Sequence, residues 1–286
     1  MSASFYLQQA LNGLSFGALL FLLASGLTLI FGLMRVANIA HGSYYLLGAY
    51  VGLSVMRWTG VFPLAILGGG VAVAAIGIVM QRWFLARFHQ QALPQVLLTM
   101  GFAFFFSDQA LLLWGGDPQS IPVPKALAGT LVLGPVYFPA YRLFVIAVGL
   151  CVFVGLWLLL EKTRLGATVR AAVDDAEMAR GLGINVGRVM TGVFALGAFL
   201  AAAGGVMGGA FLSVYPGADF DVLPLTFVVV IVGGLGSLKG ALVGSLLVGL
   251  LDNFGKAMFP ELSYFTLFAP MALILAVRPT GLFGRA

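Results

Sequence analysis

The stretch "LQQALNGLSFGALLFLLASGLTLIFGLM", residues 7–34, decides the class of fold, because it is a long apolar run without a single charged side chain. A run of about 20 apolar residues is long enough to cross the hydrocarbon core of a bilayer as a helix. The whole chain has the same character: it is 61% hydrophobic and only 9% charged, with a mean hydropathy of +1.06. Soluble domains carry about 25% charged residues. The sequence therefore predicts a polytopic membrane protein.

Two features of this first run indicate a membrane span that is kept in the mature chain. The residues before it, "MSASFY", lack the basic segment of a cleavable signal, and the apolar run continues well past Leu20. Its "GLSFG" segment, Gly13 to Gly17, spells the nucleophile elbow of serine hydrolases, but that motif needs a strand, a turn and a helix. In a membrane helix we expect Gly13 and Gly17 to be a packing pair, since helices in lipid approach closely at small residues.

Nine segments are candidates for membrane helices, and we expect an all-α fold with eight or nine crossings in a single transmembrane domain, residues 1–286. One segment is too short to cross alone and is followed by "GGLGSLKGALVG", residues 233–244. Irregular backbone at membrane depth occurs only where protein or a water-filled cavity surrounds it, so we expect a broken or re-entrant element there. The segments are Leu7–Met34, Ile39–Met56, Phe62–Phe84, Pro94–Trp114, Leu143–Leu160, Val189–Ser213, Leu223–Leu235, Ala241–Met258 and Tyr264–Val277.

The distribution of basic residues predicts the orientation, because cytoplasmic loops of membrane proteins are enriched in Lys and Arg. A nine-span arrangement with the N-terminus outside and the C-terminus in the cytoplasm leaves Arg57, Lys125, Arg142 and Lys256 outside, with the acidic turn holding Asp219 and Asp221. It places eleven of the fifteen basic residues inside: Arg35, Arg82, Arg87, Lys162, Arg164, Arg170, Arg180, Arg188, Lys239, Arg278 and Arg285.

The proline-rich segment from Gly115 to Arg142 then lies outside as an extended surface loop. Two roles fit this composition equally: a plain connector, and a docking surface for an external partner.

Charge is concentrated in "RLGATVRAAVDDAEMARGLGINVGR", residues 164–188. Residues 169–182 contain no proline and carry a stripe of small apolar side chains at helical spacing. Arg170 with Asp174, and Glu177 with Arg180, stand at spacings that support a helix. We expect a short amphipathic helix that stops at Gly181 and Gly183. The stripe consists of Val169, Ala172, Val173, Ala176 and Ala179.

This stripe is too small for firm anchorage in lipid, which requires large apolar side chains. Small side chains suit a socket on a partner protein, and a solvated cytoplasmic loop without a partner is the alternative. In either case the distribution of charge places the loop, about residues 161–189, in the cytoplasm.

Three segments carry a resemblance to a known family: "FGLMRVANIAHGSYYLLGAYVG", "RAAVDDAEMARGLGINVGRV" and "IVGGLGSLKGALVGSLLVGLLDN". Together they resemble the permease subunit of bacterial ABC importers for branched-chain amino acids, of the H type rather than the longer M type. The similarity runs from about Phe5 to Gly281. Its most specific parts are the N-x-A-H-G element that begins at Asn38 and the GG-x-G-S-x-x-G element that begins at Gly233.

The resemblance implies that the charged loop holds a coupling helix that docks in a cleft of an ATPase subunit. The family's broader signature, an "EAA" triplet with a downstream glycine, is replaced here by "AAVDDAEMARGLG", and the later I-x-L-P segment is missing. The departure puts individual ATPase contacts in doubt more than the role of the loop. The coupling residues expected from the match are Arg170, Ala172, Val173, Ala176, Glu177, Ala179, Arg180 and Gly183.

The resemblance also implies partners and a location: a second permease subunit in a heterodimer, two ATPase subunits, a soluble binding protein that delivers the amino acid, and the bacterial inner membrane. Nucleic acid is not among the partners. We expect no catalytic residues, metal or cofactor on this chain, with ATP and Mg²⁺ bound by the ATPase subunits. The closest approach to a P-loop, "GLLDNFGKA", has the wrong residue after its Lys, and two histidines, His41 and His89, are too few for a metal site.

Polar residues within apolar segments are candidates for the translocation path, because ionisable groups in spans are costly and often functional. Asp108 could line a polar cavity or bond a neighbouring helix, and Asp252 is expected to pair with Lys256 one turn on. Asn38 either caps the helix that begins near His41, with His41 bonded to a backbone carbonyl, or both lie at the inner end of the path. The candidates are Asn38, His41, Ser43, Asp108, Gly234, Gly236 and Ser237.

Three other functions fit parts of the sequence: an importer of urea or short amides from the same family, an ion-coupled secondary transporter, and a passive channel. A secondary transporter predicts inverted repeats with broken helices in both halves. The sequence shows one clear candidate, Gly233–Gly240, and only a weak echo at Gly42, Gly48 and Gly52. A channel would not need a helix that docks a partner.

Overall fold

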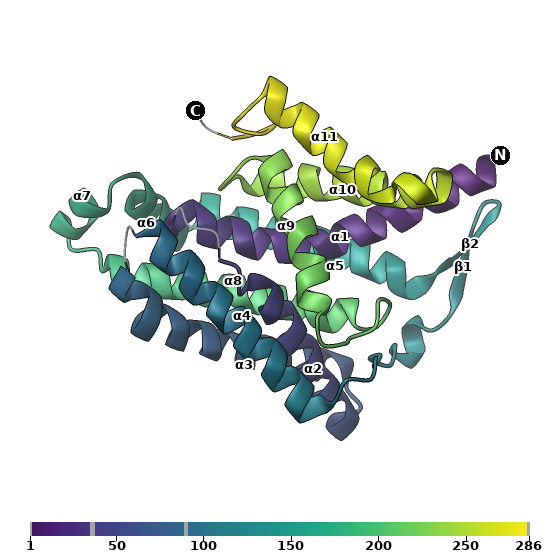
Figure 1. Ribbon diagram of the computed structural model, residues 1–286, viewed down its shortest axis with the longest axis horizontal. Helices are drawn as coiled ribbons and strands as arrows, with labels where there is room; N and C mark the ends of the chain where they lie inside the picture. Colours follow the sequence, from purple (N-terminus) through teal and green to yellow (C-terminus); the bar gives the residue numbers. More distant parts are fainter. Residues whose placement is uncertain (1, 35–37, 89–90, 285–286) are drawn as a thin grey trace.

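The computed structural model describes residues 2–34, 38–88 and 91–284 (Figure 1). Predictions for Arg35, His89 and Arg285 fall outside these ranges. The described residues form eleven α-helices and one two-stranded sheet, which confirms the all-α class. The helices are α1 Ala3–Met34, α2 His41–Thr59, α3 Phe62–Val79, α4 Ala92–Trp114, α5 Ala140–Lys162, α6 Arg164–Asp174, α7 Ala176–Gly181, α8 Val186–Gly208, α9 Ala218–Gly233, α10 Leu238–Met258 and α11 Ser263–Val277.

Six of the nine predicted segments lie in helices long and apolar enough to cross a bilayer: α1, α3, α4, α5, α8 and α10. The remaining three form α2, α9 and α11, which are shorter or less apolar. At its C-terminal end α3 continues as a π-helix, Met80–Phe84, and a 3₁₀ turn, Leu85–Phe88.

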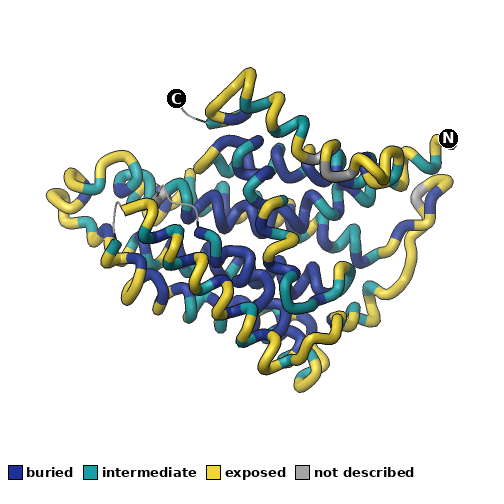
Figure 2. The backbone as a smooth tube through the Cα atoms, in the orientation of Figure 1, coloured by how far each residue is buried: buried dark blue, intermediate teal, exposed yellow. Residues whose placement is uncertain are grey.

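Helix α1 lies at the centre of the bundle and α5 at its edge. In the most apolar part of α1, 83% of the residues are buried, whereas in that of α5 only 17% are buried. The dark core in Figure 2 follows α1, α2 and α8, and exposed segments gather on α4, α11 and the two ends of the molecule. Large apolar side chains on the exposed faces fit helices that meet lipid rather than water.

The first four and the last four helices repeat one arrangement in opposite directions. Helix α1 runs from the N-terminal end of the molecule toward α6 and α7, and α8 begins beside α7 and runs back (Figure 1). Helix α10 packs on α1 as α3 packs on α8, while α2 and α9 contact each other. The order α1–α2–α3–α4 is therefore repeated, inverted, by α8–α9–α10–α11.

Two pairs of glycines allow this close packing. A Cβ added to Gly197 of α8 would lie 2.8 Å from the carbonyl oxygen of Gly26 on α1, at the crossing of the two inverted halves. A Cβ on Gly17 would lie 2.7 Å from the carbonyl oxygen of Ser245 on α10, and one on Gly13 would lie 2.9 Å from the Cα of Leu250. The prediction that Gly13 and Gly17 form a packing pair is confirmed.

The segment predicted as an extended surface loop is largely exposed, and its second half forms a β-hairpin, which the sequence analysis did not predict. Strand β1 (Thr130–Leu133) pairs antiparallel with β2 (Val136–Pro139), with Gly134 at φ +60° in the turn. The first half runs over the bundle, where Gln119 pairs with Val214. The hairpin and the start of α1 lie at one end of the molecule, and α6 and α7 lie at the other (Figure 1).

Candidate functional site: a two-helix loop and a buried polar contact

The charged loop contains two helices rather than the single helix predicted over residues 169–182. Asp175 separates α6 from α7 in extended conformation, with φ −150° and ψ 99°. Its carboxylate accepts hydrogen bonds from the backbone N–H groups of Glu177 (3.0 Å) and Met178 (2.9 Å). Aspartate competes for backbone donors in this way and so begins a new helix where apolar periodicity alone suggests continuation. The predicted stop at Gly183 is confirmed by its φ of +84°.

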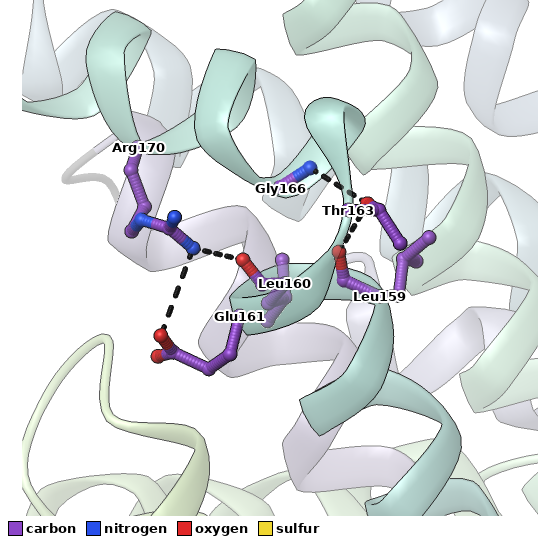
Figure 3. A network of polar contacts seen from close by, with 6 residues as sticks. All are labelled: Leu159, Leu160, Glu161, Thr163, Gly166 and Arg170. Atoms are coloured by element: carbon purple, nitrogen blue, oxygen red, sulfur yellow. Dashed lines mark hydrogen bonds and ion pairs between the residues drawn. The ribbon is translucent and has the colours of Figure 1, made fainter.

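A network of polar contacts fixes α6 to the end of α5 (Figure 3). Arg170 donates to the carbonyl oxygen of Leu160 and lies 3.8 Å from the carboxylate of Glu161. Thr163 accepts a hydrogen bond from the N–H of Gly166 at 3.2 Å and thereby caps α6. Among the described residues, the expected ion pair of Arg170 with Asp174 does not form, because the end of α5 is its partner.

The small apolar stripe of the loop faces this chain's own core. Ala172 and Ala179 are buried in a cluster with Leu29 of α1, Leu156 of α5 and Met190 of α8. Val169, Val173 and Ala176 pack around the same cluster. The socket that we expected on a partner protein is therefore supplied within the chain, which corrects the sequence-based prediction for these five residues.

The outer surface of the loop carries large apolar side chains instead. Leu165, Met178 and Leu182 are 69%, 63% and 75% exposed. Charged neighbours surround them, including Glu177 and Arg180, which are exposed and form no ion pair with each other among the described residues. The sequence analysis missed these three residues, although a large apolar side chain on the charged face of an amphipathic helix signals a contact surface.

A second constellation lies where α2 and α9 begin. The Ser43 hydroxyl donates to the Asp219 carboxylate at 2.8 Å, and both side chains are buried. The helices touch closely here, because a Cβ added to Gly42 would lie 2.6 Å from the carbonyl oxygen of Asp219. Ser43 was among the predicted path residues, whereas Asp219 was assigned to an outer turn. Its place just before an apolar run, after a glycine, was the available signal of a helix start.

His41 and Asn38 precede Ser43 in the chain by two and five residues. The Nε2 atom of His41 is 2.9 Å from the carbonyl oxygen of Leu23, so the predicted bond to a backbone carbonyl is confirmed, on α1 rather than nearby. The predicted cap was wrong: Ala40 precedes α2 and no side chain caps it. In the part of the chain that the structure describes, Nδ1 of His41, both amide atoms of Asn38 and Oδ1 of Asp219 are buried without a hydrogen-bond partner.

The glycine-rich element builds the turn between α9 and α10. Gly234 and Gly236 adopt φ values of +103° and +78°, and Ser237 accepts a hydrogen bond from the N–H of Gly240 at 3.1 Å. The predicted break is therefore present. The turn lies at the far end of α9 from Asp219, about 20 Å away at 1.5 Å per residue, so Gly234, Gly236 and Ser237 are not brought to the polar contact.

An apolar cavity of about 340 Å³ lies beside the polar contact. It is formed by α9, α11 and Ile39, which directly follows Asn38. Leu223, one turn beyond Asp219, also lines it. All its described lining residues are apolar, whereas small-molecule sites usually also carry a few polar groups that orient the ligand. Its other lining residues are Pro224, Phe227, Val228, Ile231, Phe268 and Met271.

The two remaining acidic candidates, Asp252 and Asp108, lie in different surroundings. Asp252 accepts a hydrogen bond from Lys256 at 2.8 Å, which confirms the predicted ion pair. Asp108 is exposed on α4, one turn after Phe104, whose ring lies 5.5 Å from that of Phe220 on α9. Asp108 therefore lies on the face where α4 meets α9.

The connection between α8 and α9 adds a further polar pair at this face. Tyr215 donates to the carboxylate of Asp221 at 2.6 Å. This hydrogen bond, together with partial burial, raises the pKa of Tyr215 to about 12. The hydrogen bond ties the connection between α8 and α9 to the first turn of α9.

Comparison with known proteins decides the family. The profile of the branched-chain amino acid transport system permease component matches residues 9–277. The chain belongs to this family. The permease is 31% identical to the high-affinity branched-chain amino acid transport system permease protein BraD of Pseudomonas aeruginosa, over 98% of this chain and 96% of that protein.

Two further relatives support the assignment. The permease is 29% identical to LivH of Escherichia coli K12, a high-affinity branched-chain amino acid transport system permease protein, over 98% of this chain and 96% of LivH. It is 30% identical to a probable branched-chain amino acid transport permease of Methanocaldococcus jannaschii, over 82% of this chain and 76% of that protein. Permeases of this kind are transport components rather than enzymes.

Proposed function

We propose that this permease is a membrane subunit of an ABC importer for branched-chain, hydrophobic amino acids. The observation that carries the proposal is the similarity to BraD and LivH over nearly the full length of all three chains. We place the protein in the bacterial inner membrane, with the N-terminus and hairpin outside and with α6, α7 and the C-terminus in the cytoplasm. This orientation follows the bias of Lys and Arg.

In this proposal two separate ATPase subunits, which bind ATP and Mg²⁺, dock on the exposed side of the two-helix loop. Leu165, Met178 and Leu182 are the apolar contacts, because each is exposed and their charged neighbours complete a polar rim of the kind that surrounds interface cores. Glu177 and Gly183 belong to the same surface. The roles of Ala172, Val173, Ala176 and Ala179 become internal: they hold the loop on the bundle.

Movement of the loop would reach the bundle by two routes. The first is the corner of Figure 3, where Arg170 and Thr163 tie α6 to the last turn of α5. The second is the packing of Ala172 and Ala179 on α1, α5 and α8. Closely packed elements shift as units rather than deform continuously, so closure of the ATPases would tilt these helices together.

The translocation path in this proposal runs along the face formed by α4, α9 and α11, with the second permease subunit on its other side. The 340 Å³ apolar cavity suits a branched side chain. The unpaired polar atoms of Asn38, His41 and Asp219 would gain partners when the path opens. Asp108 and Asp221 lie near its outer rim, where the soluble binding protein delivers the amino acid. Because the binding protein selects the solute, urea and short amides remain the alternative cargo.

The inverted relation of α2 to α9 favours one other function, an ion-coupled secondary transporter, because inverted repeats are typical of many members of that class. Dependence of solute uptake on ATP distinguishes the ABC importer from the secondary transporter. A secondary transporter moves its solute without ATPase subunits and does not need an exposed apolar surface on the α6–α7 loop.

The test is uptake of radiolabelled leucine by proteoliposomes that hold the permease, its partner permease, the ATPases and the binding protein. We expect uptake only with ATP. Met178→Asp should lower ATP-dependent uptake at least tenfold, because it places a charge in the docking surface, while Met178→Leu keeps the surface apolar and should leave uptake near the wild-type level. Equal uptake without ATP would favour the secondary transporter. Full activity of Met178→Asp would refute the docking surface.

A further inference from the structure

A second cavity, of about 850 Å³, lies between the end of α3 and the start of α8, and α7 contributes one of its walls. Its lining elements, the end of α3, α7 and the start of α8, lie at the end of the molecule that carries α6 and α7, away from the hairpin (Figure 1). The proposed transport path does not use it. Its polar lining residues are Gln81, Arg82, Arg180, Asn185, Arg188 and Thr191.

Three exposed arginines line this cavity from three different elements. Arg82 comes from the π-helix after α3, Arg180 from α7 and Arg188 from the first turn of α8. No acidic residue lines the cavity, and among the described residues these arginines form no ion pair. Neighbouring like charges without a counter-ion repel one another, and the guanidinium fork matches phosphate oxygens. The site is therefore built for an anion.

Gln81 lies in one wall of the cavity and belongs to the π-helix Met80–Phe84, a rare conformation that is common at functional sites. Its Oε1 atom is buried and has no hydrogen-bond partner within the described chain, so this atom does not face the cavity. The unpaired arginines, rather than Gln81, therefore indicate the kind of ligand.

The surroundings of the cavity favour a lipid over a free anion. Ile78, Leu85 and Met190 form an apolar wall next to the arginines. Beside Arg82, Trp83 is 63% exposed, and aromatic side chains of this kind gather at the interface of the bilayer with water. A free phosphate ion gains no favourable contact from an apolar wall. Basic pockets between membrane helices on the cytoplasmic side are suited to anionic headgroups.

We propose that this cavity binds the headgroup of an anionic phospholipid, with the three arginines on its phosphate. Phosphatidylglycerol is such a lipid. The bound lipid would link α3, α7 and α8, so it would brace the loop on which the ATPases dock. The proposal requires only that this end of the molecule faces the cytoplasm and is independent of the solute that is transported.

The experiment is native mass spectrometry of the purified full chain in detergent with added phosphatidylglycerol, phosphatidylcholine or inorganic phosphate. We expect the wild-type protein to retain one bound phosphatidylglycerol molecule. The double variant Arg82→Gln/Arg188→Gln should bind phosphatidylglycerol with an affinity at least about tenfold lower. Lys239→Gln is the matched control, because Lys239 is an exposed basic residue at the same end of the molecule and does not line the cavity. It should bind like wild type.

A second variant keeps the test valid if the double variant Arg82→Gln/Arg188→Gln misfolds. Arg180→Gln changes only an exposed residue of α7 and should weaken binding with an unchanged helical circular dichroism spectrum. Equal binding of phosphatidylcholine, or equal binding by the arginine variants, would overturn the proposal. Displacement of the lipid by millimolar phosphate would assign the site to a free anion. Displacement by the ATPase subunits would assign the arginines to the protein interface, and either result would refute a lipid site.

Discussion

The hydrogen bond between Ser43 and Asp219 joins the two inverted halves of the permease, and its removal tests whether they act as one unit. The bond is 2.8 Å long and buried. Because Oδ1 of Asp219 already lacks a partner among the described residues, Ser43→Ala leaves neither carboxylate oxygen with a side-chain donor. A buried hydrogen bond to a charged group contributes about 1.5–3 kcal/mol, so we expect Ser43→Ala to lower the free energy of unfolding by about that amount.

The assay is reversible unfolding in mixed micelles, followed by helical circular dichroism, for Ser43→Ala, Asp219→Asn and the double variant. A direct bond predicts a coupling energy of about 1–2 kcal/mol between the two substitutions. Ser25→Ala is the matched control, because Ser25 is equally buried but bonds only the carbonyl oxygen of Leu22 in its own helix, at 2.9 Å. Substitutions that add within about 0.3 kcal/mol would refute the reasoning that this bond couples α2 to α9.

Three further variants test other contacts. Gly249→Leu should prevent stable assembly of the bundle, since a Cβ there already meets the backbone of Gly17 at 2.6 Å; a wild-type melting temperature in detergent would contradict this. Arg170→Gln should reduce leucine uptake per ATP hydrolysed several-fold without loss of fold. Glu161→Gln breaks only an exposed ion pair, so it should lower the free energy of unfolding by less than about 1 kcal/mol. Asp175→Ala should destabilise α7 by about 1 kcal/mol, seen as faster amide hydrogen exchange; unchanged exchange over residues 176–181 would show that the cap is dispensable.

Much of the fold could be predicted from local composition. A membrane helix needs only enough consecutive apolar residues, so the six long spans were found with boundaries close to those observed. Lys256 pairs with Asp252 because residues four apart on a helix are neighbours. The candidate site was predicted only in part: Ser43 and His41 were identified, while Asp219, Met178 and Leu182 were not.

The sequence by itself determined that this protein is a bundle of membrane helices with one charged loop, because hydropathy and charge act residue by residue on the choice between lipid and water. Only the tertiary structure decided which surfaces meet. Periodicity showed that Ala172 and Ala179 share a face, but not that the face packs on this chain rather than on a partner. Ser43 and Asp219 are 176 residues apart, and no local pattern links them. Their contact arises from the inverted packing of α1 on α8, which brings the starts of α2 and α9 together inside the bundle.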